Sequence, residues 1–203
     1  METALDTELP LMTAEEFFDW ATSPERNGHL YELENGKVIE MPPPGDTHGT
    51  LCSWIAYLLW QFAIRRGRGR VTSNDTGILV KRNPDTMRGA DVMFFDENLS
   101  LNRISSRYSE RTPALVVEVY SPNDRPGKLN KRVQQYLKAG VPLVWVVFPE
   151  DRTVNVYTAK ESPRVFDETE ELTGDSVLPD FRCKVSEFFT LPGSNDEPQT
   201  TNP

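Results

Sequence analysis

Two acidic residues lie inside apolar runs that are typical of buried strands. Asp91 is followed by Val-Met-Phe-Phe, and Glu118 lies within the run Leu-Val-Val-Glu-Val. An ionised carboxylate is costly to bury unless a cation or a metal ion accompanies it. Hard cations such as Mg²⁺ or Mn²⁺ prefer carboxylate oxygens, and an ion so held can activate a water against a phosphoryl group. The two acids therefore favour metal-dependent cleavage of phosphodiesters.

Glu32 is a third acid of interest, on one arm of a predicted hairpin. Strand alternation allows it to face the core, and a solvated position on the hairpin is an equally good interpretation. Asp91 and Glu118 also have an ordinary alternative, because each could end a strand near solvent or pair with an arginine. Arg88 and Arg125 are close enough in sequence to be those partners.

A helix rich in cations follows the strand that carries Glu118. Its buried face is predicted at Leu129, Val133, Tyr136 and Leu137. Arg132 and Lys128 lie along one border of that face, whereas Lys131 points nearly away from it. We therefore expect Arg132, and after it Lys128, to reach over the sheet edge toward a phosphate. A solvated basic first turn is the alternative.

The remaining candidates carry weaker signals. Residues 65–70 form a basic run that could contact phosphates, although such a run is more often a solvated helix end. His48 is interpreted as a cap or polar contact near a helix start, and with only two histidines a histidine-based zinc site is not expected. Cys52 and Cys183 are in no ligand pattern, so we interpret them as reduced thiols of a cytoplasmic protein.

Length and charge set further bounds. The chain has 203 residues, enough for one domain, and we expect a flexible leader at 1–11, the domain at 12–190 and a disordered tail at 191–203. The net charge of −9 weighs against a general nucleic-acid binder, but a nuclease is compatible with it because part of the acid excess can bind metal. The acidic start predicts no secretion signal, and no apolar stretch reaches the roughly 18 residues that span a bilayer.

The pattern of elements predicts an α/β or α+β fold with a mixed central sheet flanked by helices. Two buried strands, 114–120 and 142–148, enclose the helix 127–139, which is typical of a parallel β-α-β unit. Three further helices are predicted: one from the capping box at Thr13, one capped by Asp46 or Thr47 and ended by Gly67, and a closing helix at 185–189. A hairpin is predicted around Asn35-Gly36. The other predicted strands are 70–81 (bent near Gly77), 88–95 and 153–157, with short strands within 164–172 and 177–180.

An ordered set of motifs resembles the Uma-two family of putative restriction endonucleases. The motifs are Tyr31-Glu32-Leu33-x-x-Gly36, Ala90-Asp91-Val92, Val117-Glu118-Val119-x-Ser121-Pro122, Tyr136-x-x-x-Gly140-Val141 and Val144-Trp145-Val146-Val147, and the match spans residues 12–189. The resemblance implies the restriction-endonuclease-like fold of the PD-(D/E)XK nuclease superfamily. It also implies that Asp91 and Glu118 ligate Mg²⁺, with Glu32 as an additional acid near the same site.

The chain departs from the family pattern at several positions. Ala90 stands where the family usually has proline, and Phe148 replaces a common aspartate. The superfamily's lysine, two residues after the second acid, is Tyr120 here. In this family a lysine of the next helix is thought to substitute, and the aligned position holds Arg132, which can stabilise charge but is a poor proton acceptor.

These observations lead to a hypothesis and two alternatives. The leading hypothesis is a Mg²⁺- or Mn²⁺-dependent endonuclease acting on DNA, with Asp91, Glu118 and Glu32 as metal ligands and Arg132 or Lys128 facing the phosphate. A nuclease fold with a decayed site, used as a binding or assembly module, is the first alternative. A hydrolase of small phosphoesters is the second. A homodimer is expected only by analogy with other nucleases of the superfamily.

Overall fold

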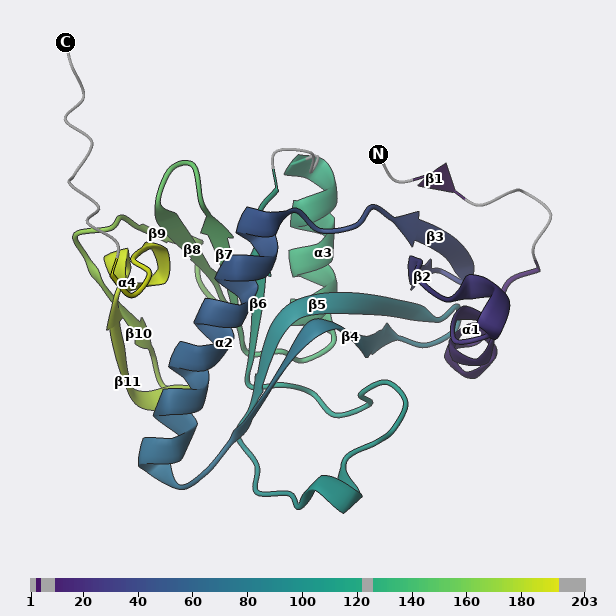
Figure 1. Ribbon diagram of the computed structural model, residues 1–203, viewed down its shortest axis with the longest axis horizontal. Coiled ribbons are helices and arrows are strands. Elements are labelled where there is room, and N and C mark those ends of the chain that lie inside the picture. Colours follow the sequence, from purple (N-terminus) through teal and green to yellow (C-terminus); the bar gives the residue numbers. More distant parts are fainter. Residues whose placement is uncertain (1–2, 5–9, 122–125, 194–203) are drawn as a thin grey trace, which may run out of the picture.

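The computed structural model describes residues 3–4, 10–121 and 126–193. A nine-stranded sheet forms the centre of the fold, with helices on both of its faces (Figure 1). A two-stranded sheet of β10 (Glu171–Gly174) and β11 (Leu178–Lys184) lies beside it. This is the mixed sheet flanked by helices that the sequence predicts.

The strand order of the large sheet is β1-β3-β2-β5-β6-β7-β8-β9, with β4 paired to β5. The β6–β7 pair is parallel and the others are antiparallel, which confirms the predicted β-α-β unit. The strands are β1 (Thr3–Ala4), β2 (Leu30–Glu34), β3 (Lys37–Met41), β4 (Arg70–Lys81), β5 (Thr86–Phe95), β6 (Leu115–Val119), β7 (Leu143–Phe148), β8 (Thr153–Tyr157) and β9 (Arg164–Phe166).

Two helices cover the two faces of the sheet. The helix α2 (Asp46–Arg66) packs on one face and α3 (Pro126–Lys138) on the other. Because side chains alternate along a strand, Val117 of β6 joins the apolar cluster under α2, whereas Val116 joins the cluster under α3. Glu118 follows the alternation of Val116 and therefore meets α3. Burial on both faces explains why β6 and β7 are almost wholly apolar.

The N-terminal part follows the predicted turn and cap signals closely. The helix α1 (Ala14–Ala21) starts at a capping box, in which the Thr13 hydroxyl accepts the Glu16 amide and the Glu16 carboxylate accepts the Thr13 amide. The turn between β2 and β3 uses left-handed conformations at Asn35 and Gly36, with φ of 50° and 79°. The hairpin then packs Leu33 against α1.

Two local predictions are wrong in detail. Gly45 is the N-cap residue of α2, and no side chain caps this end of the helix. Neither Asp46 nor Thr47 is therefore the cap. The pairing of β4 with β5 shifts at two places, across Asn74 and Asp75 and between Leu79 and Lys81, and neither shift falls at Gly77. Asn74 and Asp75 have φ of 66° and 51°. Asn and Asp tolerate this left-handed region through local hydrogen bonding, so a bulge forms at these two residues.

The remaining elements are short. The predicted strand region 164–172 splits into β9 and β10, and the loop 96–112 contains the 3₁₀ turn Leu101–Arg103. A 3₁₀ turn, Pro24–Arg26, follows α1, and α4 (Ser186–Phe189) is the last helix described.

The two ends of the chain are described only in part. In the predicted leader, Thr3–Ala4 pairs with β3, and residues 1–2 and 5–9 lie outside the described part. The predicted tail also lies outside it from residue 194, so the domain boundary at 190 stays a prediction. None of the described helices is both long and apolar enough to cross a membrane.

Candidate functional site

A cavity of about 670 Å³ lies where three neighbouring strands of the sheet separate. The β2–β5 ladder consists of the single pair Leu33–Met87, and the β5–β6 ladder ends at the pair Val92–Val117. Asp91 and Glu118 lie just beyond the last β5–β6 pair, and Glu32 lies next to the β2–β5 pair. The cavity lining includes all five residues predicted for the site, namely Glu32, Asp91, Glu118, Lys128 and Arg132.

Carboxylates occupy the positions where the strand ladders end. Asp91 Oδ2 accepts the amide hydrogen of Val119 on β6 at 2.6 Å, and Glu32 Oε1 accepts the amide hydrogen of Gly89 on β5 at 2.8 Å. Each acid therefore satisfies a main-chain donor that has lost its partner strand. Both carboxylates are buried at the cavity wall.

Glu32 is held by two arginines. Its Oε2 accepts hydrogen bonds from Arg88 Nη1 at 2.7 Å and from Arg132 Nη2 at 3.1 Å. Arg88 also donates to Gln135 and pairs with Glu34. The predicted arginine partner at Arg88 thus exists, but for Glu32, and Arg125 lies outside the described residues.

Glu118 accepts hydrogen bonds from two side chains of α3. Tyr136 Oη donates to its Oε1 at 2.6 Å, and Arg132 Nη1 donates to its Oε2 at 3.2 Å. Burial raises the pKa of the Glu118 carboxyl, Arg132 opposes the shift, and the charge of Asp91 adds to it.

Arg132 is the cation that α3 brings to the acids. Its guanidinium bridges Glu32 and Glu118 and also donates to the carbonyl of Gly89. Although burial lowers the pKa of Arg132, the two carboxylates outweigh that effect and raise it, so the side chain stays protonated. Lys131 instead pairs with Glu34.

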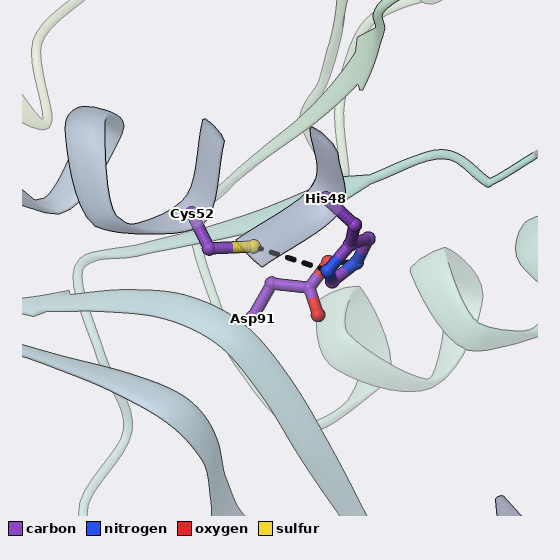
Figure 2. Close-up of side chains that lie close together, drawn as sticks. All are labelled: His48, Cys52 and Asp91. Atoms are coloured by element: carbon purple, nitrogen blue, oxygen red, sulfur yellow. Dashed lines mark hydrogen bonds and ion pairs between the residues drawn. The ribbon is translucent and has the colours of Figure 1, made fainter. Parts of the chain in front are cut away.

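His48 and Cys52 meet Asp91 from the first turns of α2, and the sequence analysis did not place them here. His48 Nε2 lies 3.2 Å from Asp91 Oδ2, and Cys52 Sγ lies 3.5 Å from His48 Nδ1 (Figure 2). The hydrogen bond to Asp91 raises the pKa of His48. The spacing of His48 and Cys52 was the signal in the sequence, because residues four apart on a helix share a face.

Asp75 is a further acid that the sequence analysis missed. The bulge in β4 turns it into the cavity wall, where burial raises the pKa of its carboxyl to about 6 and the charge of Asp91 adds to the effect. Gly89 permits this approach, because a Cβ there would lie 3.1 Å from both the Cβ and the carbonyl oxygen of Asp75. The Asn-Asp pair inside a predicted strand was the readable sign of a bulge.

The basic run 65–70 lies at the other end of α2. A helix of 21 residues is about 30 Å long, so the run is far from the cavity. Arg66 and Arg68 pair with Asp96, and Arg70 pairs with Glu97. The arrangement disfavours phosphate contact, and the arginines of this helix end pair with acids instead of being only solvated.

Two positions that depart from the family pattern contact each other. The rings of Tyr120 and Phe148 pack with centroids 5.0 Å apart. Both positions depart from the motif pattern that the sequence resembles, and they form an aromatic pair in which Tyr120 lines the cavity.

The side chains around the cavity fit a divalent ion in part. Asp91 presents a carboxylate together with an imidazole from His48, and Asp75 and Glu118 add negative charge nearby. Carboxylate and imidazole are suitable donors for Mn²⁺ and related ions. Glu32 and Glu118 are different, because their oxygens already accept hydrogen bonds from Arg132 and would have to exchange that partner for the ion.

Comparison with known proteins places the fold and the family. No curated protein matches the chain. A crystal structure of "a putative nuclease belonging to DUF820" from Anabaena variabilis ATCC 29413 has the same fold, with a TM-score of 0.73 and 20% identity over 88% of this chain and 97% of that one. The Uma2 family model, described as "Putative restriction endonuclease", matches residues 14–186. The chain therefore belongs to the Uma2 family.

Proposed function

We propose that this protein is a Mg²⁺- or Mn²⁺-dependent endonuclease that hydrolyses phosphodiester bonds of DNA. One observation carries the proposal: Asp91 and Glu118, from neighbouring strands, line one cavity together with the protonated guanidinium of Arg132. Membership of a family described as restriction endonucleases supports the same chemistry.

The proposed roles follow from the contacts of each side chain. Asp91 and Glu118 would hold the ion, with Glu32 beside them. Such an ion supplies charge to polarise the phosphoryl oxygen and to lower the pKa of an attacking water. Arg132 stays protonated, so its role would be to stabilise the negative charge that develops on the phosphate, and it would not accept a proton. Lys128 lines the same cavity and is a second candidate for the phosphate.

Nicking of supercoiled plasmid in the presence of Mg²⁺ or Mn²⁺ tests the proposal. Asp91→Asn and Glu118→Gln keep the size of each side chain and remove its charge, so activity should fall by about a hundredfold or more if these groups support the reaction. Glu171→Gln is the matched control, because Glu171 is exposed on β10 and pairs only with Arg182 among the described residues. Nicking that survives both cavity substitutions would refute the site.

A binding or assembly module with a decayed site is the second candidate. The observation in its favour is that Arg132, Arg88 and Tyr136 already satisfy the oxygens of Glu32 and Glu118. Calorimetry separates the two functions, because the module predicts no heat with Mg²⁺ or Mn²⁺ at millimolar concentration. Turnover of a model phosphodiester without DNA affinity at low salt would favour a hydrolase of small phosphoesters. A homodimer remains a prediction.

A further inference from the structure

Three different metal-ligating atoms converge on the α2 side of the cavity. His48 and Cys52 are four residues apart on α2, so both side chains leave the same face of the helix. That face lies over Asp91 of β5, and one ligand atom from each residue lies within 4.8 Å of the other two. Figure 2 shows the Cys52 thiol and the Asp91 carboxylate gathered beside the imidazole of His48.

We propose that His48, Cys52 and Asp91 form a binding site for a thiophilic divalent ion of the zinc class. Zn²⁺ is commonly held by imidazole, thiolate and carboxylate, and sites with three protein ligands leave a fourth position to water. The site shares Asp91 with the proposed nuclease centre. Occupancy by a thiophilic ion therefore takes Asp91 from that centre and inhibits DNA cleavage, a consequence that rests on the proposed function.

The donor set separates this site from the acids on the α3 side. Sulfur ligands select Zn²⁺ and similar ions, whereas Mg²⁺ prefers oxygen. Glu118 is bound by Tyr136 and Arg132 from α3, so it is not the carboxylate turned toward the thiol. Asp91 is that carboxylate, and it keeps its bond to the Val119 amide in the same arrangement.

The surroundings favour a cation at this position. Burial, with added repulsion from Asp91, Asp75 and Glu118, raises the pKa of the Cys52 thiol, so the sulfur is protonated in the metal-free protein. Binding of Zn²⁺ forms a metal–sulfur bond and releases that proton to solvent. The neighbouring acids repel the negative charge of a free thiolate. They attract the positive charge of a divalent ion bound to that thiolate, so they favour the metal-bound form.

Metal binding to the full chain tests the site without reference to activity. Co²⁺ is the spectroscopic probe, because a thiolate ligand produces a sulfur-to-cobalt charge-transfer band in the near ultraviolet. The band should appear in the wild type and in Cys183→Ser, and it should be absent from Cys52→Ser. Cys183 is the matched control, since it is also buried and lies on β11, away from the cavity.

Zn²⁺ titration by calorimetry gives the affinity. Cys52→Ser and His48→Gln should each weaken Zn²⁺ binding by about tenfold or more, which is about 1.4 kcal/mol of binding free energy. His48 is partly exposed, so His48→Gln keeps the test valid if Cys52→Ser does not fold. Equal Zn²⁺ affinity in the wild type and both variants, or no sulfur-to-cobalt band in the wild type, would overturn the proposal.

Inhibition of plasmid nicking separates this proposal from the proposed function. Zn²⁺ added in the presence of Mg²⁺ should inhibit the wild type and Cys183→Ser to the same extent. Inhibition of Cys52→Ser should need at least about tenfold more Zn²⁺. The rate of each protein is compared with its own rate without zinc. A protein that shows the cobalt band but never nicks DNA contradicts the nuclease and supports the metal site. A protein that nicks DNA without the band contradicts the metal site alone.

Discussion

Asp91 accepts the backbone amide hydrogen of Val119 at 2.6 Å, so a side chain takes the place of a ladder partner where β5 and β6 separate. The acid is thus part of the sheet and part of the cavity wall. This dual position means that its structural and chemical contributions must be measured separately.

Asp91→Ala should destabilise the protein by about 1–3 kcal/mol, because the buried Val119 amide loses its acceptor. Asp91→Asn removes the same charge but keeps an oxygen in place, so its loss of stability should be smaller. Urea unfolding of both variants measures the difference. Equal stability of the two variants would show that the bond to Val119 contributes nothing.

Arg132→Met should destabilise the protein by about 3–5 kcal/mol, because it leaves Glu32 and Glu118 buried without their shared cation. Lys131→Met is the matched control on the neighbouring residue. The ion pair between Lys131 and Glu34 is more exposed to solvent, so the loss of unfolding free energy should stay below about 1 kcal/mol.

The double variant Arg132→Met with Glu118→Gln should recover part of the loss caused by Arg132→Met, since one unpaired charge is then removed. Chemical unfolding of the four proteins of the cycle gives the coupling between the two side chains. Simple additivity of the two single substitutions would contradict the bridging role of Arg132.

Asp75→Asn should stabilise the protein at high pH and have little effect at low pH. The folded-state pKa of Asp75 is about 6, above the ordinary value of 3.8, so its ionisation disfavours the folded state. That penalty is complete above about pH 6 and absent below about pH 4.

The gain from Asp75→Asn should be about 1–2 kcal/mol at pH 8, allowing for the partial exposure of the side chain to solvent. Unfolding free energies of both proteins at pH 4 and pH 8 check this expectation. A gain of equal size at the two pH values would show that charge is not its cause.

Gly89→Ala should destabilise the protein by about 1–3 kcal/mol, because the new Cβ would press on the main chain of Asp75 at the β4 bulge. Gly49→Ala is the control, since a Cβ there meets no atom within 4 Å and alanine favours the helix. Thermal unfolding should therefore show a lower midpoint for the first variant and an equal or higher one for the second.

Local signals predicted the elements that position the site. The Asn35-Gly36 turn specified the hairpin that carries Glu32, because both residues tolerate left-handed backbone. The apolar runs around Glu118 and at 142–148 specified a parallel pair buried on two faces. The helical wheel of α3 ranked Arg132 ahead of Lys131 as a cavity residue, and in the structure Arg132 lines the cavity whereas Lys131 pairs with Glu34.

Local sequence signals did not predict contacts between segments that are distant in the chain. The bulge that turns Asp75 into the cavity depends on pairing with β5, and the cap of α2 fell to Gly45 although better capping residues follow it. His48 was interpreted as a cap and Cys52 as a simple thiol. Their meeting with Asp91 depends on how α2 lies across the sheet.

Residue type and spacing alone established that acids stand within buried strands and that a cationic helix follows them, because burial of charge and helical periodicity are local properties of the chain. The tertiary structure decided which partners those acids have: Arg132 for Glu32 and Glu118, and His48 for Asp91. The reason is physical, since these partners are brought together by the end of a strand ladder and the placement of two helices on opposite faces, which no short stretch of sequence encodes.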